Sequence, residues 1–306
     1  MRTTKLLALA TVVAATSFNV ALAGPADARP APVRGGSACV GEAGASARGG
    51  HGPDHREVSA KEQRAIARQT KARLDARGVT RAELQATSVS VPVYVHVMAG
   101  EDGSGNVTDR QVKRQIAVLN NTFAGGESTT AADTRFSFVL AGTDRYFNDV
   151  WHKDHSSSTY RKATRQGGAD ALNIWLVDFR LLGVATFPWD YAKNGDVDGI
   201  RVHYASLPGG DIANYDKGET ATHEAGHWLG LYHTFQGGCT ELNDEVSDTP
   251  AQSSPTNGCP IGRDSCSLPG LDPIHNYMDY SYDSCYTEFT SGQTSRAHSM
   301  WAAYRG

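Results

Sequence analysis

One stretch of this chain decides how the rest is interpreted: His223-Glu224-Ala225-Gly226-His227-Trp228-Leu229-Gly230-Leu231-Tyr232-His233. His223 and His227 are four residues apart, so a helix places both imidazoles on one face, about one turn from each other. Gly230 can turn the chain sharply out of that helix and bring His233 back toward the same point. Three neutral imidazoles leave one position of a tetrahedral zinc ion open, as in catalytic zinc sites. The alternative, a helix with scattered histidines, is disfavoured by the extended pattern.

Glu224 is the acidic residue of this motif, and its place next to His223 suits a general base. From there its carboxylate can reach water on the metal but is poorly placed to ligate the ion. We expect Glu224 to take a proton from zinc-bound water as that water attacks a carbonyl, and to return it to the leaving amine. A catalytically silent binding module would not need this carboxylate.

The motif HExxHxxGxxH is the signature of metzincins, which also carry a methionine-containing turn beneath the metal. The segment His275-Asn276-Tyr277-Met278-Asp279-Tyr280 resembles that turn. Three further stretches resemble the pappalysin family, notably its small secreted microbial members such as ulilysin: Trp228-Leu229-Gly230-Leu231-Tyr232-His233-Thr234-Phe235, Ser247-Asp248-Thr249-Pro250 and Phe289-Thr290-Ser291-Gly292-Gln293. The resemblance covers residues 89–306 and fades before them.

This resemblance implies a zinc endopeptidase that acts on proteins or peptides. It also implies a metzincin-type α+β domain, with a mixed twisted sheet, helices above a zinc cleft and a loop-rich C-terminal subdomain. In such a domain Met278 would form an apolar floor under the histidines without binding zinc. Tyr280 would donate a hydrogen bond to the developing oxyanion. The alternative for Tyr280 is a buried tyrosine that stabilises the turn.

Four of the five cysteines lie within residues 236–289, a region rich in Gly, Pro, Ser, Asn and Asp. A loop region of that length needs cross-links, and secretion permits disulfides. Four cysteines allow three pairings, of which the resemblance implies Cys239–Cys266 and Cys259–Cys285. The same region carries a cluster of acidic residues: Glu241, Asp244, Glu245 and Asp248. These carboxylates suit calcium, which related proteins bind in this region, or they form a solvated acidic loop.

Residues 1–23 have the features of a secretory signal peptide. Basic residues precede an apolar stretch, and small residues precede Gly24, so we expect cleavage after Ala23, with a second acceptable site after Ala28. A short membrane anchor is the alternative, although the apolar stretch is short for one. The sequence therefore predicts a secreted protein without a membrane segment in its mature form.

Residues 24–88 differ from the rest of the chain and are expected to be a prosegment. They carry 11 basic and 7 acidic residues, whereas residues 89–306 carry 16 and 26. The part up to about residue 55 lacks the large apolar residues of a packed core. Ser59 can cap a helix that ends at Gly78, with a thin apolar side of Ala65, Ile66 and Leu74. Opposite charge favours docking of this leader on the catalytic domain as an intramolecular inhibitor. A solvated tail is the alternative.

Cys39 is the odd cysteine and lies in this leader. A thiolate is a good zinc ligand, so Cys39 could fill the open position and keep the proenzyme inactive, an arrangement known elsewhere among metzincins. The flanking residues match no fixed motif for such a switch. A stray thiol or an intermolecular disulfide is the alternative.

Residues 89–306 have the pattern of an α+β domain. We expect strands at residues 89–97, 135–140, 172–177 and 199–204, a helix at 109–123 and a last helix after Thr290. The resemblance places residues 183–188 on the sheet edge that pairs with extended substrate; an ordinary edge strand is the alternative.

Together these features predict a secreted zinc endopeptidase made as a zymogen. The alternatives are a silent metzincin-like binding module and a zinc hydrolase that acts on non-peptide amides. Nucleic-acid binding has no support, because residues 89–306 are acidic.

Overall fold

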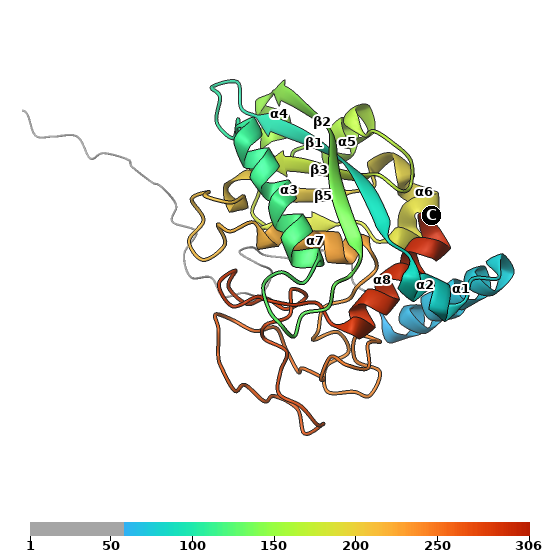
Figure 1. The fold of residues 1–306 in the computed structure, drawn as a ribbon. Coiled ribbons are helices and arrows are strands. Elements are labelled where there is room, and N and C mark those ends of the chain that lie inside the picture. The colour runs from blue at the N-terminus through green and yellow to red at the C-terminus, as the bar shows by residue number, and fades with distance from the viewer. Residues whose placement is uncertain (1–57) are drawn as a thin grey trace, which may run out of the picture. The chain divides into compact units, whose positions relative to one another are not determined.

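The computed structural model describes residues 58–306. The predicted signal peptide, the first part of the predicted prosegment and Cys39 lie outside these residues. A five-stranded sheet in the order β2-β1-β3-β5-β4 is central to the fold (Figure 1). Its strands are β1 (Val89–Ala99), β2 (Phe136–Phe147), β3 (Leu172–Val177), β4 (Gly183–Ala185) and β5 (Ile200–His203). The first four in spatial order are parallel, and β4 is antiparallel to β5 at one edge, so the sheet is mixed as predicted.

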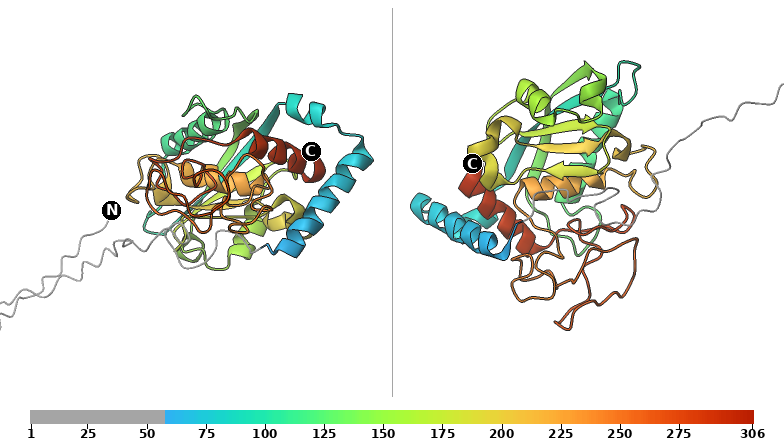
Figure 2. Two further views of the ribbon diagram at one scale, coloured as in Figure 1. Left: turned by 90° about the horizontal axis from the view of Figure 1, so that it is seen from below. Right: turned by 180° about the vertical axis from the view of Figure 1, so that it is seen from behind.

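Helices cover both faces of this sheet (Figures 1 and 2). Because side chains alternate along a strand, β3 serves both faces. Ile174 and Leu176 join the core cluster under α3 (Asp109–Phe123) and α7 (Glu219–Trp228), whereas Trp175 and Val177 pack with Tyr160 of α5 (Ser157–Thr164). The sheet thereby fixes α7, the helix that carries the histidine motif.

Local signals define several helices. The helix α3 begins at a capping box formed by Thr108 and Gln111, and α8 (Ser291–Tyr304) begins at another formed by Thr290 and Gln293. In the leader, α1 (Ala60–Arg77) ends at Gly78, whose φ of 66° is left-handed, and α2 (Arg81–Ala86) follows. The remaining short elements are α4 (Asp149–His152), η1 (Pro188–Asp190), α6 (Tyr191–Asn194), η2 (Gly195–Val197) and η3 (Tyr204–Ser206).

Two local predictions need correction. The strand expected at residues 135–140 begins at Phe136 and continues to Phe147, because the polar second half of β2 still pairs with β1 along its length. In α1 the predicted apolar side was Ala65, Ile66 and Leu74, but Ala65 is exposed, and Ile66 is buried together with Gln63 and Thr70.

Residues 234–290 form no helix or strand apart from an isolated bridge between Asn276 and Glu288. Disulfides join Cys239 to Cys266 and Cys259 to Cys285, the pairs that the resemblance implies. Within residues 58–306, no helix combines the length and the apolar character needed to cross a membrane.

Candidate metal centre

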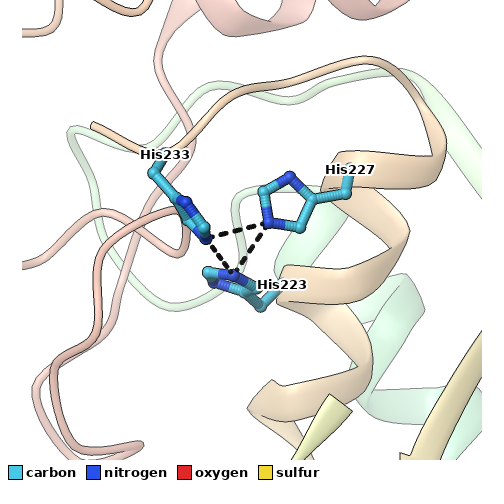
Figure 3. A group of neighbouring side chains, drawn as sticks. All are labelled: His223, His227 and His233. Atoms are coloured by element: carbon cyan, nitrogen blue, oxygen red, sulfur yellow. Dashed lines mark hydrogen bonds between the residues drawn. The ribbon is translucent and has the colours of Figure 1, made fainter. Parts of the chain in front are cut away.

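The helix α7 presents His223 and His227 on one face, and both side chains are buried. Their Nε2 atoms lie 3.1 Å apart. The Nε2 atom of His233 lies 3.2 Å from that of His223 and 3.0 Å from that of His227 (Figure 3). The three ring nitrogens therefore converge on one point, although His233 lies beyond the end of the helix.

Gly230 provides the turn that returns the chain to this point. Its φ is +93°, a conformation that glycine adopts without steric cost. The amide of Gly230 donates to the carbonyl of His227 at 2.8 Å, and the amide of Leu231 donates to that of Gly226 at 2.9 Å. These two bonds form a Schellman motif, which ends α7 and directs the chain toward His233.

Backbone carbonyls fix the tautomers of two histidines. The Nδ1 atom of His223 lies 2.6 Å from the carbonyl oxygen of Tyr277, and that of His227 lies 2.8 Å from the carbonyl oxygen of Leu231. A carbonyl only accepts hydrogen bonds, so both Nδ1 atoms donate, and in the neutral rings the Nε2 lone pairs face each other.

Such facing lone pairs repel unless a cation lies between them. A triangle with sides of 3.0–3.2 Å allows one ion to lie about 2.0–2.1 Å from all three nitrogens, the usual zinc–imidazole distance. A carbonyl that accepts a hydrogen bond from the other ring nitrogen is typical of metal-ligating histidines. The donor set therefore fits a metal ion.

The predicted methionine turn lies against this site. Met278 is fully buried beneath α7, and a β-carbon built on Gly226 would overlap its sulfur atom. The ring of Tyr280 lies 4.8 Å from that of His233, centroid to centroid, and the ring of Phe235 stacks on His233 at 4.5 Å and lies 5.0 Å from that of Tyr280. The structure thus brings both predicted residues of the turn to the three histidines.

Glu224 lies on α7 beside the histidines and is buried. Its carboxylate packs directly on the backbone of Gly183, because a β-carbon built on Gly183 would overlap Oε1. Gly183 begins β4, the strand at the sheet edge. Glu224 and the edge strand are therefore in contact, a relation that no sequence motif indicated.

A buried hydrogen-bond network, also missed from the sequence, joins the loops on either side of the site. Gln252 accepts a bond from the hydroxyl of Thr234 at 2.9 Å and donates to the carboxylate of Asp279 at 3.0 Å. Thr234 follows His233, and Asp279 lies between Met278 and Tyr280. Burial raises the pKa of Asp279. The side-chain amide of Gln252 therefore links the residue after His233 to the methionine turn.

The acidic loop does not gather its four predicted calcium ligands. Asp244 accepts bonds from the amide of Val246 and the hydroxyl of Thr249, Glu245 pairs with Arg296 at 2.8 Å, and Asp248 accepts from Thr290 and Gly292 at the start of α8. Glu241 is exposed. Calcium remains a prediction that the side chains of this loop do not by themselves support.

Other histidines behave as structural residues. His96, His152 and His298 are buried and hydrogen-bonded to protein groups. Within residues 58–306, the only second group with metal-ligand spacing is Cys259, His275 and Cys285, whose cysteines are joined in a disulfide.

Comparison with known proteins gives a consistent result. The profile of the peptidase M43 family, described as pregnancy-associated plasma protein-A, matches residues 179–302. An extracellular metalloprotease of Verticillium alfalfae is 49% identical over 71% of this chain and 78% of that protein. The chain belongs to the pappalysin family of metalloproteases. Membership agrees with the resemblance seen in the sequence.

Solved structures of this family share the fold. A promirolysin mutant of Tannerella forsythia superposes with a TM-score of 0.68 at 29% identity, over 80% of this chain and 89% of that one. Mature mirolysin in complex with a cleaved peptide gives a TM-score of 0.62 at 31% identity, over 69% and 91%. As a pappalysin, the chain is a metalloendopeptidase with the predicted metzincin-type domain.

Proposed function

We propose that this pappalysin is an extracellular zinc endopeptidase in which His223, His227 and His233 hold the ion. The observation that carries the proposal is the convergence of three buried Nε2 atoms, two of them oriented by backbone carbonyls. Imidazole donors favour zinc and neighbouring transition metals over calcium or magnesium. Relatives named extracellular metalloproteases support the location.

The chain supplies the proton transfers. When bound, zinc would polarise the scissile carbonyl and acidify the attacking water. Glu224 accepts the proton of the water and delivers it to the leaving amine. Tyr280 donates its hydroxyl hydrogen to the oxyanion that develops on the carbonyl. The contact between Glu224 and Gly183 of β4 supports this role, because a peptide paired with the edge strand would pass close to the Glu224 carboxylate.

Synthesis as a zymogen is the second part of the proposal, with residues 24–88 as prosegment and Cys39 as a candidate inhibitory zinc ligand. The promirolysin mutant matches more of this chain than mature mirolysin does, 80% against 69%. The difference between these two shares is close to the length of the segment that holds α1, α2 and the residues joining them to β1. It supports the proposal that this segment belongs to a leader that is removed on activation.

Peptide hydrolysis and its metal dependence test the first part. The purified protein is incubated with a peptide library, with and without a zinc chelator, and bound metal is measured by elemental analysis. We expect internal peptide bonds to be cleaved, one zinc per chain, and loss of cleavage with the chelator that added zinc reverses. Binding without cleavage would favour a silent module, and cleavage of non-peptide amides alone would favour an amidase.

A further inference from the structure

The leader helix α1 packs on α8 and on an apolar cluster that borders the metal site. Val58 and Ile66 are buried against Phe187, Tyr232 and Met300. Trp189 and Tyr304 are partly buried beside them. We call the five residues of the body the leader-binding cluster: Phe187, Trp189, Tyr232, Met300 and Tyr304. Figures 1 and 2 show α1 alongside α8, the last helix.

Polar contacts fix the direction of α1 on this surface. Arg77 donates to the carbonyl oxygens of Ala302 and Gly306, and Arg73 donates to that of Ala303 at 3.2 Å. These are carbonyls at the C-terminal end of α8, which carry partial negative charge and have no partner within the helix. The guanidinium of Arg73 also lies 4.6 Å from the centre of the Tyr304 ring.

Open grooves border the leader. One, of about 460 Å³, lies between α1 and α8 and is lined in part by Thr70, Leu74, Arg296 and Met300. A second, of about 350 Å³, lies beside α2. Most side chains of α1 are exposed, so the leader contacts the body along only part of its surface.

The leader-binding cluster nevertheless reaches the metal site. The ring of Phe187 lies 5.6 Å from that of the ligand His227, edge to face, and 5.9 Å from that of Tyr232. Removal of the leader would take Val58 and Ile66 away from Phe187, Tyr232 and Met300, and would uncover apolar surface beside His227. Exposed patches of this kind mark interaction sites.

We propose that this surface is a docking site of the mature enzyme for a basic helix, and that its first occupant is the cleaved leader segment 58–87, held without a covalent link. The proposal rests on the proposed removal of the leader. The contacts of the leader are specific: Val58 and Ile66 pack in the cluster, and two arginines donate to carbonyls at the end of α8. Because residues 89–306 are acidic and the leader is basic, salt should weaken the complex.

The test uses the full chain with Glu224→Gln, so that self-cleavage plays no part. Recognition sites for a sequence-specific protease are inserted before Val58 and after Thr87, which is exposed. After cleavage, gel filtration at increasing salt shows whether segment 58–87 elutes with the body, and near-ultraviolet circular dichroism reports whether the body stays folded. We expect co-elution at low salt and release at high salt, with the body folded in both.

Matched variants within α1 show whether the contacts of Arg73, Arg77 and Ile66 are responsible for retention of segment 58–87. The double change Arg73→Ala and Arg77→Ala should weaken retention at least tenfold, and so should Ile66→Ala. The double change Arg64→Ala and Arg68→Ala removes the same charge from exposed positions of the helix and should weaken it far less.

Three outcomes would overturn the proposal. Complete separation at low salt would show that the surface does not hold the segment. Equal weakening by both arginine pairs would reduce the contact to general charge attraction. Unfolding of the body on release would make α1 part of the catalytic domain. None of these outcomes depends on zinc or on natural processing. The proposed protease function is therefore tested independently of the docking site.

Discussion

The metal site is built by two regions that are stabilised in different ways. Residues 89–228 bury regular strands and helices in a continuous apolar core. Residues 234–290 have no helix or regular strand. They add Tyr277, Met278, Tyr286 and Phe289 to the same core, and two disulfides and a network of side-chain hydrogen bonds hold the rest of this region. The first region supplies His223, His227 and Glu224, and the second supplies the methionine turn with Tyr280.

We therefore expect substitutions in the two regions to have different effects, and we call this difference the division between them. A residue on α7 is positioned by a helix within the core, so its loss should change the chemistry and leave the fold intact. A residue in the loops is positioned by cross-links and by single side chains such as Gln252, so its loss should alter geometry and stability together.

Glu224→Gln should lower kcat/KM by about three to four orders of magnitude, because it removes the general base and little else. The amide matches the carboxylate in shape and can still pack on Gly183. We expect unchanged zinc content and an unchanged melting temperature. Glu101→Gln, at an exposed position, is the matched control and should retain full activity. Normal cleavage by the Glu224 variant would reject the proposed mechanism.

Tyr280→Phe should lower kcat by about 10²–10³-fold with little change in KM, as expected for loss of one donor to the oxyanion. Its control is Tyr282→Phe on the same loop, whose ring packs against Tyr215 away from the histidines. The alternative role, stabilisation of the turn, predicts the opposite pattern: a lower melting temperature with kcat nearly intact. Steady-state kinetics and thermal unfolding of both variants separate the two roles.

The same division explains how much could be read from the sequence. The helix α3 was predicted at both ends, because an apolar stripe and a capping box are local signals. The second half of β2 was missed because its side chains are polar and only pairing with β1 makes it a strand. The short helices α2, α4 and α5 were not predicted, since stretches of that length carry too little periodicity.

The candidate site follows the same rule. The three histidines converge as their spacing indicates, because one helix and one glycine turn are enough to bring them together. The carbonyls that orient His223 and His227 belong to Tyr277 and Leu231, and any residue type has such a carbonyl. The contacts of Gly183 and Gln252 arise only from tertiary packing. No motif could have identified them.

Replacing Cys259 and Cys285 together by serine should destabilise the loop region by about 2–4 kcal/mol. This disulfide holds the segment from His275 to Tyr280, since the carbonyl of Cys285 also lies 2.6 Å from Nδ1 of His275. We therefore expect activity to fall at temperatures where the sheet region remains protected from hydrogen exchange. The serine pair at Cys239 and Cys266 is the control. Loss of the Cys239–Cys266 disulfide should destabilise the loops while kcat at low temperature is kept, because this bond does not hold the segment from His275 to Tyr280. Equal loss of kcat with both serine pairs would show that the Cys259–Cys285 disulfide has no special part in positioning that segment.

The smallest effect concerns Asp244, whose pKa burial raises from 3.8 to about 7, although Thr249, Val246 and Arg296 oppose the shift. Between these values the folded carboxyl keeps a proton that the unfolded chain has lost, so stability falls as the pH rises through this range. The expected contribution near pH 5–6 is a loss of about 1.4 kcal/mol per pH unit. Asp244→Asn cannot titrate and should lack this component of the slope, which denaturant unfolding at several pH values measures.

Calcium turns the same variant into a test of the acidic loop. A bound cation would favour the ionised carboxylate of Asp244 and lower its pKa, so calcium should remove the loss of stability near pH 7 in the wild-type protein. Asp244→Asn should gain much less from calcium. If calcium leaves both proteins unchanged, the loop is solvated and holds no ion. If the pH slopes of the two proteins are identical, burial does not keep Asp244 protonated, and the hydrogen bonds from Val246 and Thr249 stabilise its charge instead.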